Sequence, residues 1–293
     1  METFTHDGLT FEVSDDGPAD GRIVISLHGF PEDRQSWKPL TALLARAGYR
    51  VLAPEQRGYS PGARPRGRRN YTVERLSGDV LALADAAGAD RFHLIGHDWG
   101  ALVAWDLAGR HPERLRSLTA LSVPHPRAVQ HAARRTNQVF RTWYVLAFQI
   151  PMLPEAMLQL IGAERAARFF ERDGLDAVTA ERYAARIPCR AEMTTRINWY
   201  RAIPLRLGQG PPVVTVPTLY IWGTGDHYIH PLAAEQCGHF VAAPYRFELL
   251  EGASHWLPST AADRMIEPLL EHLAGNEANG AGYGARGSRS DPV

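Results

Sequence analysis

The run Gly96-His97-Asp98-Trp99-Gly100 places an acidic residue at the centre of a glycine-flanked turn. It follows the apolar segment 92–95 and precedes a helical pattern that begins at Gly100. A G-x-nucleophile-x-G sequence between a strand and a helix is typical of a sharp turn that presents a nucleophilic side chain. Taken alone, Asp98 could equally cap the following helix. The interpretation therefore depends on whether other segments supply the remaining parts of a catalytic site.

Two backbone N–H groups are candidates for an oxyanion hole. His28-Gly29-Phe30-Pro31 directly follows a predicted strand, 23–27. In proteins with such a turn, this loop supplies one N–H and the residue after the nucleophile supplies the other. We therefore expect the N–H groups of Phe30 and Trp99 to face the carboxyl group of Asp98.

An acid and a histidine follow two later strands. Asp226 ends the run Gly223-Thr224-Gly225-Asp226 after the predicted strand 218–222, and His255 follows the predicted strand 247–250. Active sites of open α/β sheets collect at the carboxyl ends of strands. The chain order nucleophile, acid, histidine is the order that accompanies this kind of turn. We predict a triad of Asp98, Asp226 and His255.

The elements that must position these residues alternate between strands and helices. Strands are predicted at 9–13, 23–27, 49–53, 92–95, 115–121, 218–222 and 247–250, and helices at 37–47, 73–88, 100–111 and 263–273. Alternation of this kind indicates an α/β fold with a mostly parallel sheet flanked by helices on both faces.

A helical segment interrupts this pattern. Residues 124–212 are rich in Arg, Ala, Met and aromatic residues and contain no clear strand pattern. We predict a core of residues 1–123 and 213–274, with 124–212 inserted as a helical lid. Residues 275–293 are rich in Gly, Asn, Ser and Arg and are expected to be disordered.

Composition restricts the partners of the chain. The formal net charge is zero, which gives no reason to expect nucleic acid or anionic lipid as a partner. The arginine cluster at 64–69 is typical of a solvated loop. The two cysteines have no metal-ligand spacing, and no apolar run approaches the ~20 residues of a membrane span. We expect a cytoplasmic protein that needs no metal.

The motifs resemble those of epoxide hydrolases of the α/β-hydrolase superfamily, relatives of the haloalkane dehalogenases. The resemblance covers residues 21–273 and includes Pro54-Glu55-Gln56-Arg57-Gly58, which has Glu where the family has Asp. It also includes two lid segments, Asn198-Trp199-Tyr200-Arg201 and the looser match Tyr144-Val145-Leu146-Ala147-Phe148-Gln149-Ile150-Pro151. In the family, a tyrosine of each segment points at the nucleophile. The resemblance thus implies catalytic roles for Tyr144 and Tyr200, although core packing is the default for such residues.

This resemblance implies hydrolysis of an epoxide to a vicinal diol. Asp98, ionised at neutral pH, would open the ring and form an ester; both tyrosines would donate protons to the alkoxide. His255, oriented by Asp226, would activate water to hydrolyse that ester. No cofactor is implied. Substrate-binding candidates are His28, Phe30, Pro31, Trp99, Tyr144 and Tyr200.

Alternatives remain open. A haloalkane or haloacid dehalogenase would use the same triad. However, haloalkane dehalogenases usually have Asn where this chain has Phe30, and fluoroacetate dehalogenases usually have Arg where it has Trp99. A serine esterase is disfavoured by Asp98. A non-catalytic binding protein on this fold would not need the whole triad. The sequence leaves the particular epoxide, its stereochemistry and the choice between monomer and homodimer undetermined.

Overall fold

The structure is a computed structural model that describes residues 1–206, 208 and 210–277. Within this part of the chain, eight strands form one sheet in the order β1-β2-β4-β3-β5-β6-β7-β8. The pairs β1–β2 and β2–β4 are antiparallel, and the remaining pairs are parallel. The strands are β1 (Thr3–His6), β2 (Leu9–Asp16), β3 (Arg22–Leu27), β4 (Tyr49–Pro54), β5 (Phe92–His97), β6 (Leu115–Leu121), β7 (Thr218–Gly223) and β8 (Tyr245–Leu250).

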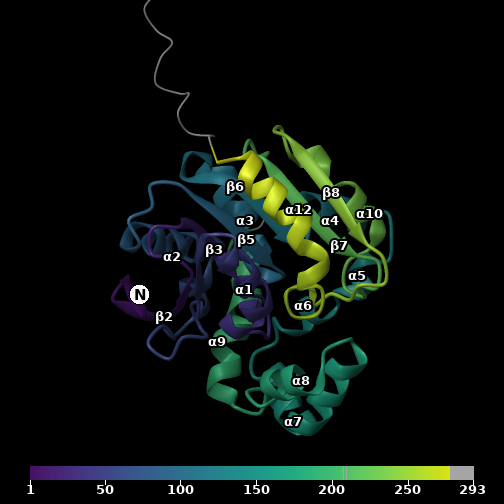
Figure 1. Cartoon of the computed structure of the whole chain (residues 1–293). Helices are drawn as coiled ribbons and strands as arrows, with labels where there is room; N and C mark the ends of the chain where they lie inside the picture. Colours follow the sequence, from purple (N-terminus) through teal and green to yellow (C-terminus); the bar gives the residue numbers. More distant parts are fainter. Residues whose placement is uncertain (207, 209, 278–293) are drawn as a thin grey trace, which may run out of the picture.

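Helices connect these strands, and further helices occupy the segment of the chain that runs from β6 to β7. Those of the sheet region are α1 (Lys38–Arg46), α2 (Val73–Ala86), α3 (Trp99–Arg110), α10 (Pro231–Glu235), α11 (Leu257–Thr260) and α12 (Ala262–Gly275). Those between β6 and β7 are α4 (Pro126–Ala133), α5 (Gln138–Arg141), α6 (Tyr144–Ala147), α7 (Leu153–Arg172), α8 (Ala177–Ala184) and α9 (Arg190–Ala202). Short 3₁₀ turns lie at Arg34–Trp37, Arg68–Tyr71, Pro112–Arg114, Ile203–Arg206 and Cys237–Phe240. Figure 1 shows α7, α8 and α9 to one side of the sheet, away from most of α12.

The predicted α/β architecture is confirmed, with an eight-stranded and mostly parallel sheet. Strand β1 was not predicted; it is a short edge strand with a single buried residue, Phe4. The last helix extends to Gly275, where the tail was expected to begin, and residues 278–293 lie outside the described residues. The division into core and lid at 124 and 212 stays a prediction.

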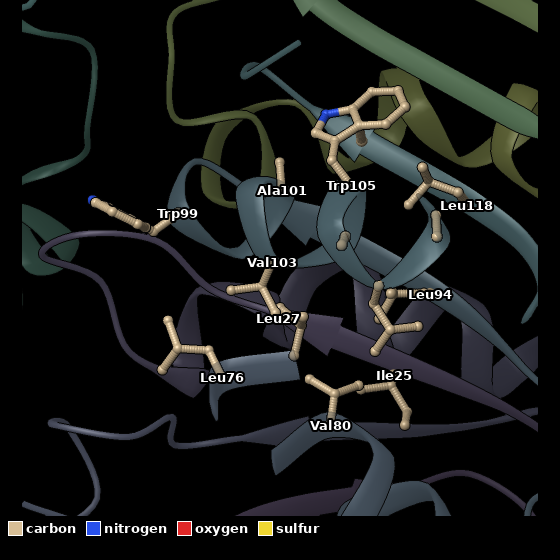
Figure 2. Packing of buried hydrophobic residues seen from close by; sticks show 14 of the residues in the cluster. Ile25, Leu27, Leu76, Val80, Leu94, Trp99, Ala101, Val103, Trp105 and Leu118 are labelled. Atoms are coloured by element: carbon tan, nitrogen blue, oxygen red, sulfur yellow. The ribbon is translucent and has the colours of Figure 1, made fainter. Parts of the chain in front are cut away.

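Apolar side chains on both faces of the sheet bind it to its helices. In β3, Val24 packs on one face with Leu44 of α1 and Leu269 of α12. The next residue, Ile25, points to the opposite face and joins the cluster formed with α2 and α3. Figure 2 shows this second cluster, which includes Leu76, Val80, Val103 and Trp105. Because the central strands are buried on both faces, the loops at their ends are held in fixed positions.

Helix α9 connects the inserted helices to the core through hydrogen bonds to backbone. The indole Nε1 of Trp199 donates to the carbonyl oxygen of Arg57 at 2.8 Å, and the hydroxyl of Thr195 donates to that of Gly58 at 2.7 Å. Trp199 is 2% exposed. These contacts fix the position of its neighbour, Tyr200, relative to the sheet.

Candidate active site

The backbone at Asp98 has the conformation of a sharp turn between β5 and α3. Its φ of 50° and ψ of −116° lie in a region that non-glycine residues rarely adopt. Helix α3 then passes very close to β3: a Cβ atom at Gly100 would lie 2.0 Å from the carbonyl oxygen of Leu27. Glycine is therefore required at position 100 for the helix to begin here, and the turn carries Asp98 to the carboxyl edge of the sheet.

The carboxyl group of Asp98 faces two of the groups predicted to surround it. The N–H of Phe30 donates to Oδ1 at 2.8 Å, and Nε2 of His255 lies 3.6 Å from Oδ2. The N–H of Trp99 belongs to the first turn of α3, where N–H groups have no acceptor within the helix. The loop after β3 thus directs a donor at this carboxyl group, and the corresponding role of the Trp99 N–H stays a prediction.

His255 is oriented by the carboxylate of Asp226. Its Nδ1 lies 2.8 Å from Oδ2 of Asp226. The other oxygen, Oδ1, accepts hydrogen bonds from the N–H groups of Tyr228 and Ile229 at 2.7 and 3.0 Å. Because both carboxylate oxygens are engaged, Asp226 holds one orientation, and the ring of His255 presents Nε2 towards Asp98.

The charges of these groups shift their pKa values in opposite directions. Burial alone would raise the pKa of Asp98, but the hydrogen bond and positive charge of His255 bring it below its ordinary value. Burial alone would lower the pKa of His255, but the adjacent Asp226 and Asp98 carboxylates raise it well above its ordinary value. The site therefore favours an ionised Asp98 beside a protonated His255.

Tyr144 of α6 and Tyr200 of α9 line the same cavity as Asp98 and His255. The cavity has a volume of about 490 Å³ and is lined mostly by apolar side chains. The two phenol rings lie 6.0 Å apart between centroids, and the ring of Tyr200 packs edge-on against that of Trp99 at 4.9 Å. Burial raises the pKa of both phenols, and the negative charge of Asp98 raises them further. Both phenols are thus kept protonated.

A buried carboxylate that was not predicted from the sequence holds the loop after β3 and the residue before Asp98. Glu32 is fully buried, and its Oε2 accepts from the N–H of Gly29 at 2.6 Å and lies 2.7 Å from Nδ1 of His97. Nε2 of His97 lies 2.9 Å from the carbonyl oxygen of His255. Burial by itself raises the pKa of Glu32, but His97 and the Gly29 N–H bring it below its ordinary value. The position of Glu32 directly after Pro31 was the available sequence signal.

Tyr228 was also missed, and it links His255 to the inserted helices. Its ring lies edge-on to the imidazole of His255 at 4.8 Å, and it lines the cavity. Its hydroxyl donates to Oδ2 of Asp173 at 2.9 Å, and the indole of Trp256 donates to the same oxygen at 2.9 Å. Asp173 thus holds two aromatic rings that both pack against the imidazole of His255. Nothing in the local sequence marks these two contacts, because Asp173 lies 55 positions from Tyr228 and 83 positions from Trp256 along the chain.

Three predicted substrate-binding residues are not among the side chains that line the described cavity. His28 is fully buried, and its Nε2 accepts from the N–H of Gln56 at 3.3 Å. Phe30 packs edge-on against Tyr200 at 5.4 Å and is followed by Pro31 in a cis peptide bond. Their contact with substrate stays a prediction. Among the described residues, no group of three or more His, Cys, Asp or Glu side chains is arranged to hold a metal ion.

Comparison with known proteins identifies the family of the chain. The model of the alpha/beta hydrolase fold family matches residues 22–262. Epoxide hydrolase A of Mycobacterium tuberculosis is 32% identical over 92% of this chain and 96% of its own, and the AB hydrolase superfamily protein YfhM of Bacillus subtilis is 33% identical over 91% and 95%. The crystal structure of epoxide hydrolase A from Mycobacterium thermoresistibile superimposes with a TM-score of 0.81 at 29% identity, covering 94% of this chain and 98% of that one. The chain therefore belongs to the α/β-hydrolase fold family, in the branch that contains these epoxide hydrolases.

Proposed function

We propose that this protein hydrolyses an epoxide to a vicinal diol through a covalent ester on Asp98. The observation that carries the proposal is the presence of two phenols, the half-buried Tyr144 and the buried Tyr200, in one mostly apolar cavity with Asp98 and His255. The names of the relatives agree with it, since several are epoxide hydrolases. An epoxide needs both a nucleophile for carbon and a proton donor for oxygen, and this cavity contains both.

In the first step, a carboxylate oxygen of Asp98 attacks a ring carbon and the C–O bond to the epoxide oxygen breaks. The electron pair of that bond remains on the oxygen, which takes a proton from the hydroxyl of Tyr144 or Tyr200. The lowered pKa of Asp98 keeps the nucleophile ionised, so it needs no base. The product of this step is a hydroxyalkyl ester of Asp98.

In the second step, water attacks the carbonyl carbon of the ester while His255 accepts a proton from that water. The N–H groups of Phe30 and Trp99 stabilise the negative oxygen of the tetrahedral intermediate, a donor of this kind being worth ~2.7–4 kcal/mol. The intermediate collapses, the proton passes from His255 to the departing alkoxide, and the diol leaves. The new carboxyl group of Asp98 then gives its remaining proton to His255, which restores the ionised nucleophile.

The ester itself prepares His255 for its role as a base. In the free site, the negative charges of Asp226 and Asp98 both raise the pKa of His255. Alkylation removes the charge of Asp98, and with it one of the two influences that favour the protonated ring. A proton held by His255 can then return to the tyrosine that lost one, which leaves a neutral imidazole beside the ester.

The dehalogenase alternative uses the same first step but expels halide in place of an alkoxide. Halide release requires side-chain donors at the leaving group, and Phe30, which stands where haloalkane dehalogenases usually have Asn, cannot supply one. A non-catalytic binding protein would not need a charged carboxylate and a histidine held 3.6 Å apart. A cytosolic location agrees with the two free cysteines and stays a prediction, as does the choice between monomer and homodimer.

The experiment that tests the proposal is a single turnover in ¹⁸O-labelled water with enzyme in excess over epoxide. If Asp98 attacks carbon, its own oxygen enters the diol and the label enters the carboxyl group of Asp98. Mass spectrometry of the diol and of the peptide that contains residue 98 separates the two products. A labelled diol with an unlabelled peptide would mean direct attack by water and would overturn the ester mechanism. Failure to turn over any small, aryl or long-chain epoxide, with turnover of matched alkyl halides, would favour the dehalogenase.

A further inference from the structure

Large exposed apolar side chains gather in one stretch of the inserted helices, residues 139–161, which includes α5, α6 and the first part of α7. We call their side chains the apolar lid surface. The most exposed are Leu160 at 83%, Phe140 at 78%, Leu146 at 67%, Met152 at 62% and Trp143 at 60%. The others are Val139, Ile150, Leu153, Met157 and Ile161. So many exposed apolar side chains in 23 consecutive residues are unusual for a surface in contact with water and indicate an interaction site.

Hydrogen bonds to the protein hold both charged side chains of this stretch. Its stretch of chain contains only two charged residues, Arg141 and Glu155. Nη1 of Arg141 points inward and donates to the carbonyl oxygens of residues 226, 227 and 229 at 3.2–3.3 Å. Glu155 is 2% exposed and pairs with Arg201 at 2.6 Å. An apolar partner could therefore cover this surface with Glu155 kept in its ion pair and with Arg141 kept on its carbonyl acceptors.

Positive charge borders the apolar lid surface on its N-terminal side. Arg127, Arg134 and Arg135 of α4 and the residues after it are exposed. No Asp or Glu occurs between Glu113 and Glu155. The zero net charge of the whole chain therefore conceals a strongly basic stretch next to the apolar one.

The cavity of the candidate active site opens beside this surface. Val139 and Leu146 belong to both, since they are 46% and 67% exposed and also line the cavity with Asp98. A molecule dissolved in the apolar phase that covers the lid would meet the cavity at these two side chains.

We propose that the apolar lid surface docks on the surface of an anionic lipid bilayer. The apolar side chains would enter the boundary between headgroups and acyl chains, while Arg127, Arg134 and Arg135 would contact lipid phosphates. No helix among the described residues is long and apolar enough to cross a bilayer, so the association is peripheral. If the proposed function holds, the substrates are apolar epoxides that partition into lipid and enter the cavity from it.

Two other occupants fit less well. A symmetric pairing of two copies through this surface would bring the arginines of both to one interface without an acidic side chain from the same stretch. Residues 278–293 contain only Tyr283 and Val293 as large apolar side chains, too few to cover it.

The test is co-sedimentation with vesicles, without substrate, so its outcome does not depend on the reaction. The full chain is mixed with vesicles of phosphatidylglycerol or of phosphatidylcholine at low and high salt. We expect binding to phosphatidylglycerol that weakens with salt. The triple variant Phe140→Ser, Trp143→Ser and Leu160→Ser should lose roughly tenfold or more of its partitioning, because it removes three large apolar side chains. The double variant Arg134→Gln with Arg135→Gln should lose roughly tenfold of its partitioning to phosphatidylglycerol vesicles. Its partitioning to phosphatidylcholine vesicles should be unchanged.

Matched controls distinguish docking from misfolding. Val178 on α8 and Leu249 on β8 are 74% and 53% exposed but lie outside the apolar lid surface, so Val178→Ser with Leu249→Ser should bind vesicles as the wild type does. The triple variant should keep the wild-type melting temperature and turnover of a water-soluble epoxide. Absence of wild-type binding to either vesicle, or unchanged binding by the triple variant, would overturn the proposal. A wild-type dimer that the triple variant dissociates, without vesicle binding, would assign the surface to a second copy.

Discussion

Replacing His255 with glutamine should separate the two steps of the proposed reaction. Ring opening requires the ionised Asp98 and a phenol, neither of which His255 supplies. Ester hydrolysis requires a base within reach of a water beside Asp98, and Nε2 of His255 lies 3.6 Å from Oδ2 of that residue. Without its base, the second step slows by ~10²–10⁴-fold. If the two steps have similar rates in the wild type, even the smaller value leaves about 99% of the enzyme as ester at steady state.

Intact-protein mass spectrometry after mixing with epoxide measures this ester directly. The mass added to His255→Gln should equal that of the whole epoxide, because ring opening releases no fragment. An alkyl halide turned over by a dehalogenase would instead leave only its alkyl group. His227→Gln is the matched control: this exposed histidine follows Asp226 directly and does not line the cavity, so turnover should be unchanged and no adduct should accumulate.

Multiple turnover by His255→Gln at the wild-type rate, with no adduct, would refute the reasoning for both residues. Slow turnover with no adduct would place the loss in ring opening and would show that His255 acts before the ester forms. The variant Asp98→Asn should form no adduct with the same epoxide, which confirms that residue 98 is the point of attachment.

Three other predictions test separate parts of the site. Tyr144→Phe or Tyr200→Phe alone should leave partial ring opening, whereas the double variant should lose ~10²-fold or more in single-turnover rate while keeping its circular dichroism spectrum. Glu32→Ala leaves His97 and the Gly29 N–H without their buried acceptor and should lower the free energy of unfolding by ~3–5 kcal/mol in urea titrations, unlike the exposed Glu113→Ala. As pH falls, ring opening should persist because the pKa of Asp98 is lowered, while ester hydrolysis should decline as His255 becomes protonated. Quench experiments should therefore find more ester in acid. An equal decline of both steps would contradict this.

Local backbone requirements made the sheet and its turns predictable from the sequence. The turn at Asp98 needs glycine at position 100 because α3 starts against the carbonyl oxygen of Leu27, and that need is visible as a motif. The central strands of the sheet, β3 to β7, are buried on both faces, so they occur as short apolar runs with clear ends. Strand β1 has no such pattern, since its pairing with β2 at the edge of the sheet depends on contacts outside its own four residues.

Contacts between distant segments could not be predicted in the same way. Glu32 directly follows the loop motif that ends at Pro31, and His97 belongs to the turn motif around Asp98. Their hydrogen bond nevertheless joins residues 65 positions apart and depends on the pairing of β3 with β5. Asp173 contacts Tyr228 and Trp256 from the C-terminal end of α7, a position set by the packing of the inserted helices. Both contacts are long-range consequences of the fold, without a local sequence pattern.

The structure divides the proposed reaction between two parts of the chain. The groups assigned to ester hydrolysis follow strands of one sheet: Phe30 after β3, Asp98 after β5, Asp226 after β7 and His255 after β8. The phenols assigned to ring opening come from α6 and α9, in the helices between β6 and β7. Hydrolysis of an alkyl ester makes similar demands on the enzyme whatever the alkyl group, but ring opening requires the phenols to match the position of one epoxide oxygen. Changes in the packing of α6 and α9 can thus alter the substrate while the sheet keeps the hydrolytic groups in place.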